Sequence, residues 1–150
     1  MLKSKYVVAV LLIGAAALTS CKKPEKPAEP AGILKKWAEA TEKIDYKTYK
    51  KYEVNPKEHR VFREIFRTYF LRDIMIISTE ELDRKDIHSD HAGNKYIKSN
   101  VIFTATEVSR KTRAPVQMVR GEVLFVKYSE GSRKDDGWLM FNRTLIRTKW

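Results

Sequence analysis

Two long stretches in the second half of the chain alternate apolar and polar residues, and this alternation limits the possible folds most. The apolar side of the first stretch comprises Ile97, Val101, Phe103 and Ala105. The apolar side of the second comprises Val119, Val123 and Phe125. A period of two is typical of strands that bury one face. The sequence therefore predicts long antiparallel strands over residues 96–108 and 115–129, with Gly121 marking a bulge or bend in the second.

Residues before these strands recur at helical spacing. The first apolar stripe comprises Ile33, Leu34, Trp37, Ala40, Thr41 and Ile44. Asp45 is a predicted cap of a short second helix, and Asn55 with Pro56 predicts the start of a third. The stripe of that third helix comprises Phe62, Ile65, Phe66, Tyr69 and Phe70. Strands are expected again over residues 73–82 and 138–148. This order predicts an α+β fold, in which N-terminal helices pack on a strongly curved, cone-like antiparallel sheet of about four strands.

The first twenty residues differ from everything that follows. Lys3 and Lys5 precede an apolar run over residues 6–17. A positive start, a short apolar core and small residues before a processing site are typical of an export signal. The run is also shorter than the stretch of about 20 apolar residues that spans a bilayer. We therefore expect residues 1–20 to be a cleaved signal peptide.

The signal ends in Leu18-Thr19-Ser20-Cys21, and Cys21 is the only cysteine of the chain. This sequence resembles the lipobox of bacterial lipoproteins. The resemblance implies that the Cys21 thiol receives a diacylglycerol, that cleavage occurs just before it, and that its new amine is acylated, for example with palmitate. The alternative is a stray cysteine after an ordinary signal. A lysine rather than an aspartate at position 22 favours the outer membrane of the cell envelope over the inner membrane.

Residues 21–32 combine the predicted lipid-bearing cysteine with a Pro-, Lys- and Glu-rich linker. Proline recurs there at every third position, at Pro24, Pro27 and Pro30. Such a segment favours extended, semi-rigid conformations and cannot bury a core. We expect it to hold a domain formed by residues 33–150 away from the bilayer.

The chain carries a formal net charge of +11. Export argues against nucleic acid as a partner, whereas anionic lipid, lipopolysaccharide or an acidic wall polymer would suit a basic face. The lysines that could form such a face are Lys35, Lys36, Lys43, Lys47, Lys50 and Lys51. The alternative is a solvated surface that is merely rich in lysine.

Short motifs in the predicted domain carry a second resemblance. They are Trp37-x-x-Ala40, Asp45-Tyr46, Tyr49 and Gly137-Trp138. Together with the helix-then-strand order, they resemble the nuclear transport factor 2-like superfamily, also called SnoaL-like or cystatin-like cone folds. The resemblance implies a cone with an open or filled mouth. It also implies either a small-molecule isomerase or hydrolase, or a non-catalytic module that could form a homodimer through its open sheet face.

Three groups of residues are candidates for a site. Aromatic residues that could line a ligand pocket, or simply form the core, are Trp37, Tyr49, Phe66, Tyr69 and Phe103. His88, Asp90 and His91 could bind zinc or copper, or could form a solvated loop. Glu107 and Glu122 could form an inward acid–base pair, or face solvent beside basic side chains.

No catalytic motif is recognisable, and no cofactor is expected. The sequence thus favours a non-catalytic, membrane-anchored envelope lipoprotein that binds a protein, a wall polymer or a small ligand. The alternatives are an enzyme with an open cone pocket and a metal-handling surface protein.

Overall fold

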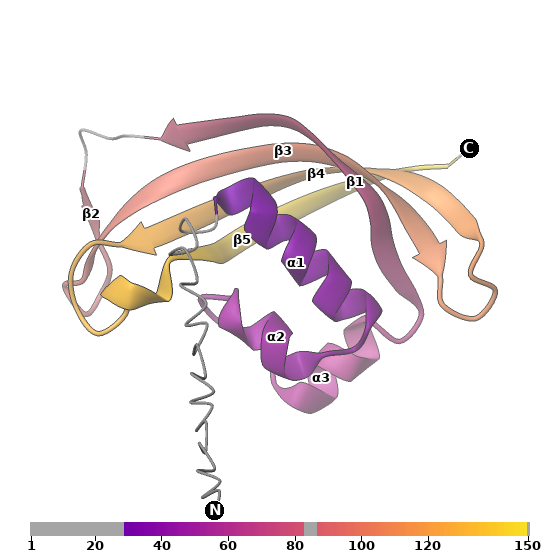
Figure 1. Ribbon diagram of the computed structural model, residues 1–150, viewed down its shortest axis with the longest axis horizontal. Coiled ribbons are helices and arrows are strands. Elements are labelled where there is room, and N and C mark those ends of the chain that lie inside the picture. Colours follow the sequence, from indigo (N-terminus) through magenta and orange to yellow (C-terminus); the bar gives the residue numbers. More distant parts are fainter. Residues whose placement is uncertain (1–28, 83–86, 150) are drawn as a thin grey trace, which may run out of the picture.

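A computed structural model describes residues 29–82 and 87–149 (Figure 1). The predicted signal peptide, Cys21 and the linker up to residue 28 lie outside the described residues. No helix in the described ranges is long and apolar enough to cross a membrane.

The first two helices are joined by a tight connection. Helix α1 spans Pro30–Glu42 and begins three residues before the predicted domain start, because a proline is well suited to the first turn of a helix. Helix α2 spans Tyr46–Lys51. The predicted cap is present: the Asp45 side chain accepts a hydrogen bond of 3.1 Å from the backbone N–H of Thr48.

The third helix is shorter than predicted. Helix α3 spans His59–Ile65, so the prediction that Asn55 and Pro56 start it is wrong. The reason lies at Lys57, whose backbone C=O accepts a bond of 3.0 Å from the Tyr46 hydroxyl and whose N–H donates 3.3 Å to the Tyr49 hydroxyl. These bonds hold the segment in a non-helical path. Tyr69, predicted to continue the helix, instead opens the first strand.

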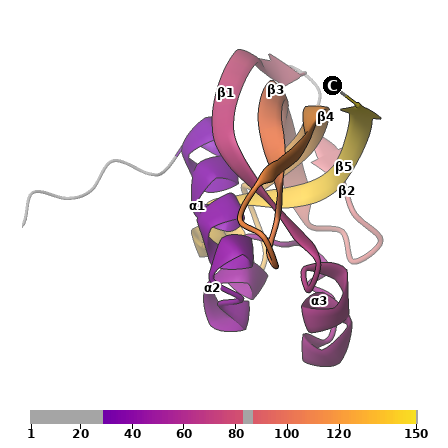
Figure 2. The same ribbon diagram turned by 90° about the vertical axis from the view of Figure 1, so that its right-hand side faces the viewer.

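The remaining chain forms one antiparallel sheet. Its strands are β1 (Tyr69–Leu82), β2 (His88–Ser89), β3 (Lys95–Ser109), β4 (Pro115–Tyr128) and β5 (Trp138–Thr148). A short 3-10 helix, η1 (Lys134–Asp136), precedes β5. The order across the sheet is β1-β3-β4-β5, and β2 pairs with β3. The three helices lie on one side of this sheet (Figure 2). The predicted α+β architecture is confirmed.

The predicted strong, cone-like curvature is wrong. The sheet remains open, with β1 and β5 as its two edges. The expected bulge at Gly121 is absent, since this residue keeps its register with Phe103 on one side and Leu145 on the other. Register shifts occur elsewhere, and two of the four interrupt the edge strand β1.

Gly121 has a packing role instead. A Cβ atom at this position would lie closer than 3.0 Å to two ring carbons of Phe103. The Phe103 ring is 1% exposed and fills the centre of the core. The missing side chain of Gly121 therefore makes room for an aromatic ring on the neighbouring strand.

The core lies between the helices and the concave face of the sheet. Its largest fully buried side chains are Trp37, Tyr49, Phe62, Phe70, Phe103 and Phe125. The predicted inner faces of β3 and β4 are buried, as the alternation indicated. The interior is therefore filled by side chains contributed from both layers.

Candidate binding hollow and the arginine end

A small hollow remains at the rim of this core, between the helices and the last strand. It has a volume of about 150 Å³. Its lining residues are Trp37, Ile65, Phe66, Tyr69, Phe70, Leu71, Glu107, Arg143, Leu145 and Arg147. Apolar and aromatic groups form most of the wall, and two guanidinium groups and one carboxylate supply its polar atoms. This composition is typical of small-molecule sites.

Glu53 orients two residues that line the hollow, Trp37 and Arg143, without lining it itself. Its Oε1 atom accepts a bond of 2.9 Å from the indole N–H of Trp37 and one of 2.6 Å from Nη1 of Arg143. The Arg143 guanidinium also lies over the Trp37 ring, 4.6 Å from its centroid. The Glu53 side chain is only 7% exposed. Its charge is therefore held in a largely buried ion pair, and both partners are oriented by it.

The segment carrying Glu53 is held against β5 by main-chain bonds. The Val54 N–H donates 3.0 Å to the Met140 carbonyl, and the Met140 N–H donates 2.7 Å to the Tyr52 carbonyl. This pairing places the Glu53 carboxylate on the inner face of the sheet beside Arg143. The position of this side of the hollow is thus set by backbone geometry.

Glu107 forms the second buried ion pair. Its carboxylate accepts bonds of 3.0 and 3.3 Å from Nε of Arg147, and a further bond from the Gln117 amide. The Glu107 side chain is 5% exposed, whereas that of Arg147 is 49% exposed. Within the part of the chain that the structure describes, the two Nη groups of Arg147 donate to no protein atom. They remain available to a ligand.

The proposed acid–base pair of Glu107 and Glu122 does not assemble. Glu107 points inward, but Glu122 is exposed on the opposite face and accepts a bond of 2.7 Å from the Asn100 amide. Neighbouring positions on a strand point to opposite faces. In the register of β3 with β4, Glu107 falls on the inner face and Glu122 on the outer face.

The predicted pocket residues divide into two groups. Trp37, Phe66 and Tyr69 line the hollow together. Tyr49 and Phe103 do not, because they are buried at 0% and 1% exposure in the core. Burial raises the pKa of the Tyr49 hydroxyl above its ordinary value. The predicted aromatic residues thus contribute both to the hydrophobic core and to the wall of the hollow.

The predicted metal residues are not brought together as a metal site. Asp90 accepts bonds of 3.0 Å from the Asn94 side-chain amide and of 2.9 Å from the backbone N–H groups of Asn94 and Ala92. The bond from the Asn94 amide contributes most to lowering the pKa of the Asp90 carboxyl, and the two backbone bonds add to it. The His88 ring stacks on Tyr96, and His91 is exposed. In residues 29–82 and 87–149, no group of three potential metal-binding side chains is present.

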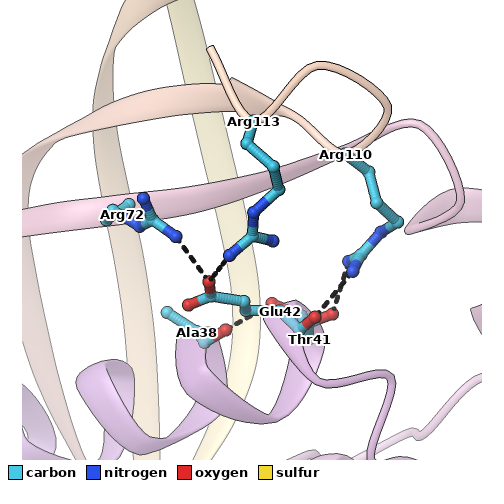
Figure 3. A network of polar contacts seen from close by, with 6 residues as sticks. All are labelled: Ala38, Thr41, Glu42, Arg72, Arg110 and Arg113. Carbon is cyan, nitrogen blue, oxygen red and sulfur yellow. Dashed lines mark hydrogen bonds and ion pairs between the residues drawn. The ribbon is translucent and has the colours of Figure 1, made fainter. Parts of the chain in front are cut away.

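A dense group of arginines lies at the far end of α1, where the β3–β4 turn meets the helices (Figure 3). Glu42 accepts bonds of 2.7 Å from Arg72 and 2.9 Å from Arg113. These two bonds lower the pKa of the Glu42 carboxyl below its ordinary value, Arg72 contributing most. The Glu42 carboxylate thus forms ion pairs with two guanidinium groups.

Arg110, in the same turn, lies over the Phe70 ring, 5.1 Å from its centroid, and its hydrogen bonds within the described residues go to main-chain oxygens. It donates 2.6 Å to the Glu42 carbonyl, 3.0 Å to that of Thr41 and 3.1 Å to that of Phe66. It therefore caps the carbonyl end of α1, which carries a partial negative charge. Burial, reinforced by the charge of Arg113, lowers the pKa of Arg110.

Sequence reasoning missed the residues that define both features. Glu53, Arg143 and Arg147 belong to no recognisable motif. The one available signal was the alternation along β5, which places Arg143 and Arg147 on the inner face of the sheet.

No protein-family model matches the chain, and no curated protein matches it significantly.

Proposed function

We propose that this chain is a lipoprotein of the bacterial cell envelope, anchored through Cys21, with an α+β domain of the nuclear transport factor 2-like type that serves as a non-catalytic binding module. The lipobox and the spacer support the anchor. Helices packed on one antiparallel sheet are compatible with the proposed superfamily. The outer membrane is the favoured location.

The hollow beside Trp37 is the observation that carries the binding role. Glu53 and Glu107, the two buried carboxylates beside it, are both held by arginines. An acid–base catalyst needs a carboxyl group within reach of substrate and able to exchange a proton. Because Glu53 and Glu107 are held in ion pairs, we infer that they position the guanidinium groups of Arg143 and Arg147.

The chemistry of the hollow favours a small anion with an apolar body. Trp37, Phe66 and Leu145 offer an apolar wall, and Arg147 offers unused N–H donors at the edge. Guanidinium groups match the geometry of a carboxylate, which accepts two parallel bonds. A flat organic carboxylate of small size is therefore the ligand class that we assign to this site.

Binding can be tested with benzoate as the probe, on the full lipidated protein in phosphatidylcholine nanodiscs. With 5-fluorotryptophan incorporated, we expect the ¹⁹F resonance of Trp37 to shift and that of Trp138, which does not line the hollow, to stay in place. Arg147→Gln should weaken binding about tenfold, since one charge-assisted hydrogen bond contributes roughly 1.5–3 kcal/mol.

Arg120→Gln is the matched control, because it removes the same charge from an exposed position on the outer face of the sheet. It should leave benzoate binding unchanged. An unshifted Trp37 resonance at high benzoate concentration, or equal weakening in both variants, would contradict the proposed binding site.

The anchor is tested separately. Cys21→Ala is expected to abolish labelling with palmitate and to release the protein from the membrane fraction, since the acyl chains supply the stable attachment. Ser20→Ala, which keeps a small residue before the cysteine, should still be labelled and membrane-bound. A Cys21→Ala protein that remains labelled in the membrane pellet would disprove lipidation at this residue.

A further inference from the structure

A second and larger hollow opens at the arginine end of the domain, away from the Trp37 site. Its volume is about 480 Å³, within the range of ordinary ligand sites. Helix α3 and the β3–β4 turn supply most of its lining. The charged groups at its wall comprise Arg60, Arg63, Arg67, Arg110 and Glu64, together with His59.

Three of these arginines belong to α3 or to the bend that follows it. Arg60 and Arg63 lie three residues apart on α3 and are neighbours on its surface. Arg67 follows two residues after the helix ends at Ile65 and lines the same hollow. All three are exposed. Among the described residues none of them forms an ion pair with an acidic side chain, although Glu64 lies between them in the sequence. Their N–H donors face solvent rather than protein.

Arg110 adds a fixed positive charge at the base of this hollow. Its three hydrogen bonds go to carbonyl oxygens, and the carbonyl end of α1 and the charge of Glu42 offset its own charge only in part. The Glu42 carboxylate is already shared by Arg72 and Arg113. Positive charge therefore exceeds negative charge both in the hollow and beside it.

The backbone at the rim of the hollow is also unusual. Ile44 follows α1 in the left-handed region, at φ 54°. A β-branched residue rarely adopts this conformation. The Asp45 N–H donates 2.8 Å to the Ala40 carbonyl and the Ile44 N–H donates 3.2 Å to that of Thr41, a pattern that closes the helix. Strain of this kind persists only where the surroundings hold it in place, and here the carbonyls at the end of α1 are bonded by Arg110.

We propose that this hollow is a binding site for a phosphate group, held by Arg63, Arg67 and Arg60 over the fixed charge of Arg110. Guanidinium groups bind phosphate oxygens through paired N–H donors, and several of them lining one hollow can surround a single phosphate. The group can belong to a lipid headgroup or to a soluble phosphate. The proposal is independent of the benzoate-type site, which lies on different residues.

The test uses modification of arginines by phenylglyoxal, read by mass spectrometry at each residue. The full lipidated protein in maltoside micelles is treated with and without inorganic phosphate. In a second arm it is reconstituted into nanodiscs of phosphatidylcholine, with or without phosphatidic acid. We expect protection of Arg63 and Arg67 by at least tenfold, and no protection of Arg120, which reports on non-specific ionic effects.

Variants make the test specific. Arg63→Gln should reduce the protection of Arg67 about tenfold, whereas Arg120→Gln should leave it unchanged. Both positions are exposed, so neither variant should affect folding.

The two arms identify the source of the phosphate. Protection in both arms assigns the site to phosphate groups in general, and protection only with phosphatidic acid assigns it to a lipid headgroup. Protection by inorganic phosphate alone assigns it to soluble ligands. Lack of protection in both arms, or protection of Arg120 to the same extent as Arg63 and Arg67, would overturn the proposal.

Discussion

Replacing Glu53 with leucine is expected to lower the free energy of unfolding by about 3 kcal/mol, the lower end of the cost of breaking a buried ion pair from one side. The change leaves the Arg143 guanidinium without its carboxylate and the Trp37 indole N–H without its acceptor. The Arg143 side chain is 24% exposed, so water relieves part of the penalty. Urea denaturation followed by circular dichroism measures the effect.

Two companion variants separate charge from packing. Adding Arg143→Met to Glu53→Leu should recover much of the loss, because an apolar pair of similar volume often replaces a buried ion pair without cost. Glu122→Gln changes an exposed carboxylate and should alter stability by less than about 0.5 kcal/mol. If Glu53→Leu were as mild as Glu122→Gln, the Glu53 ion pair would not stabilise the fold.

Gly121→Ala should destabilise the protein by about 2 kcal/mol, within the usual range for overpacking a core. The added Cβ would overlap the Phe103 ring. It cannot shift toward β5 to relieve this overlap, because the Leu145 side chain lies 3.0 Å away on that side. Because the clash is with a ring, Phe103→Leu should relieve it. The double variant is therefore expected to be more stable than the sum of the single effects indicates.

Thermal denaturation of the four proteins in this cycle gives the coupling between the two positions. Gly32→Ala provides a control, since a Cβ there meets nothing within 4 Å and helix α1 should gain slightly from alanine. Additive effects of Gly121→Ala and Phe103→Leu would show that the ring is not the reason for glycine at position 121.

The strands were predictable because their signal is local. Alternation over residues 96–108 and 115–129 depends only on one face being buried, and Val101, Val119 and Val123 are indeed fully buried. The last strand begins and ends where the pattern indicated, at Trp138 and Thr148.

The third helix was predicted poorly because a tertiary contact decides its start. An Asn-Pro pair is a good local start signal, but the hydroxyl groups of Tyr46 and Tyr49 bind the backbone of Lys57. No local pattern reports that a tyrosine earlier in the chain will supply such a bond. The same reason made Tyr69 look helical, since an aromatic residue suits a helix stripe and a strand equally well.

The candidate sites were predictable only in part for the same physical reason. Trp37, Phe66 and Tyr69 were expected at a pocket, and they do line one. The ion pairs that shape this pocket join Glu53 to Arg143 and Glu107 to Arg147, across 90 and 40 residues. Contacts of that range depend on strand register, which the sequence pattern leaves open.

Helix α1 runs from the N-terminal side of the domain, at Pro30, to the group of arginines around Glu42. The chain enters this helix at Pro30 and meets the arginine end at Glu42, a rise of about 20 Å for a helix of this length. In the lipid-anchored form that we propose, α1 would be a rigid spacer between the tethered N-terminal side and the large basic hollow. A molecule standing upright on its membrane presents that hollow to the opposite side of the compartment, and only a molecule lying flat presents it to its own leaflet. The direction of α1 relative to the bilayer would thus decide which surface the arginines can reach.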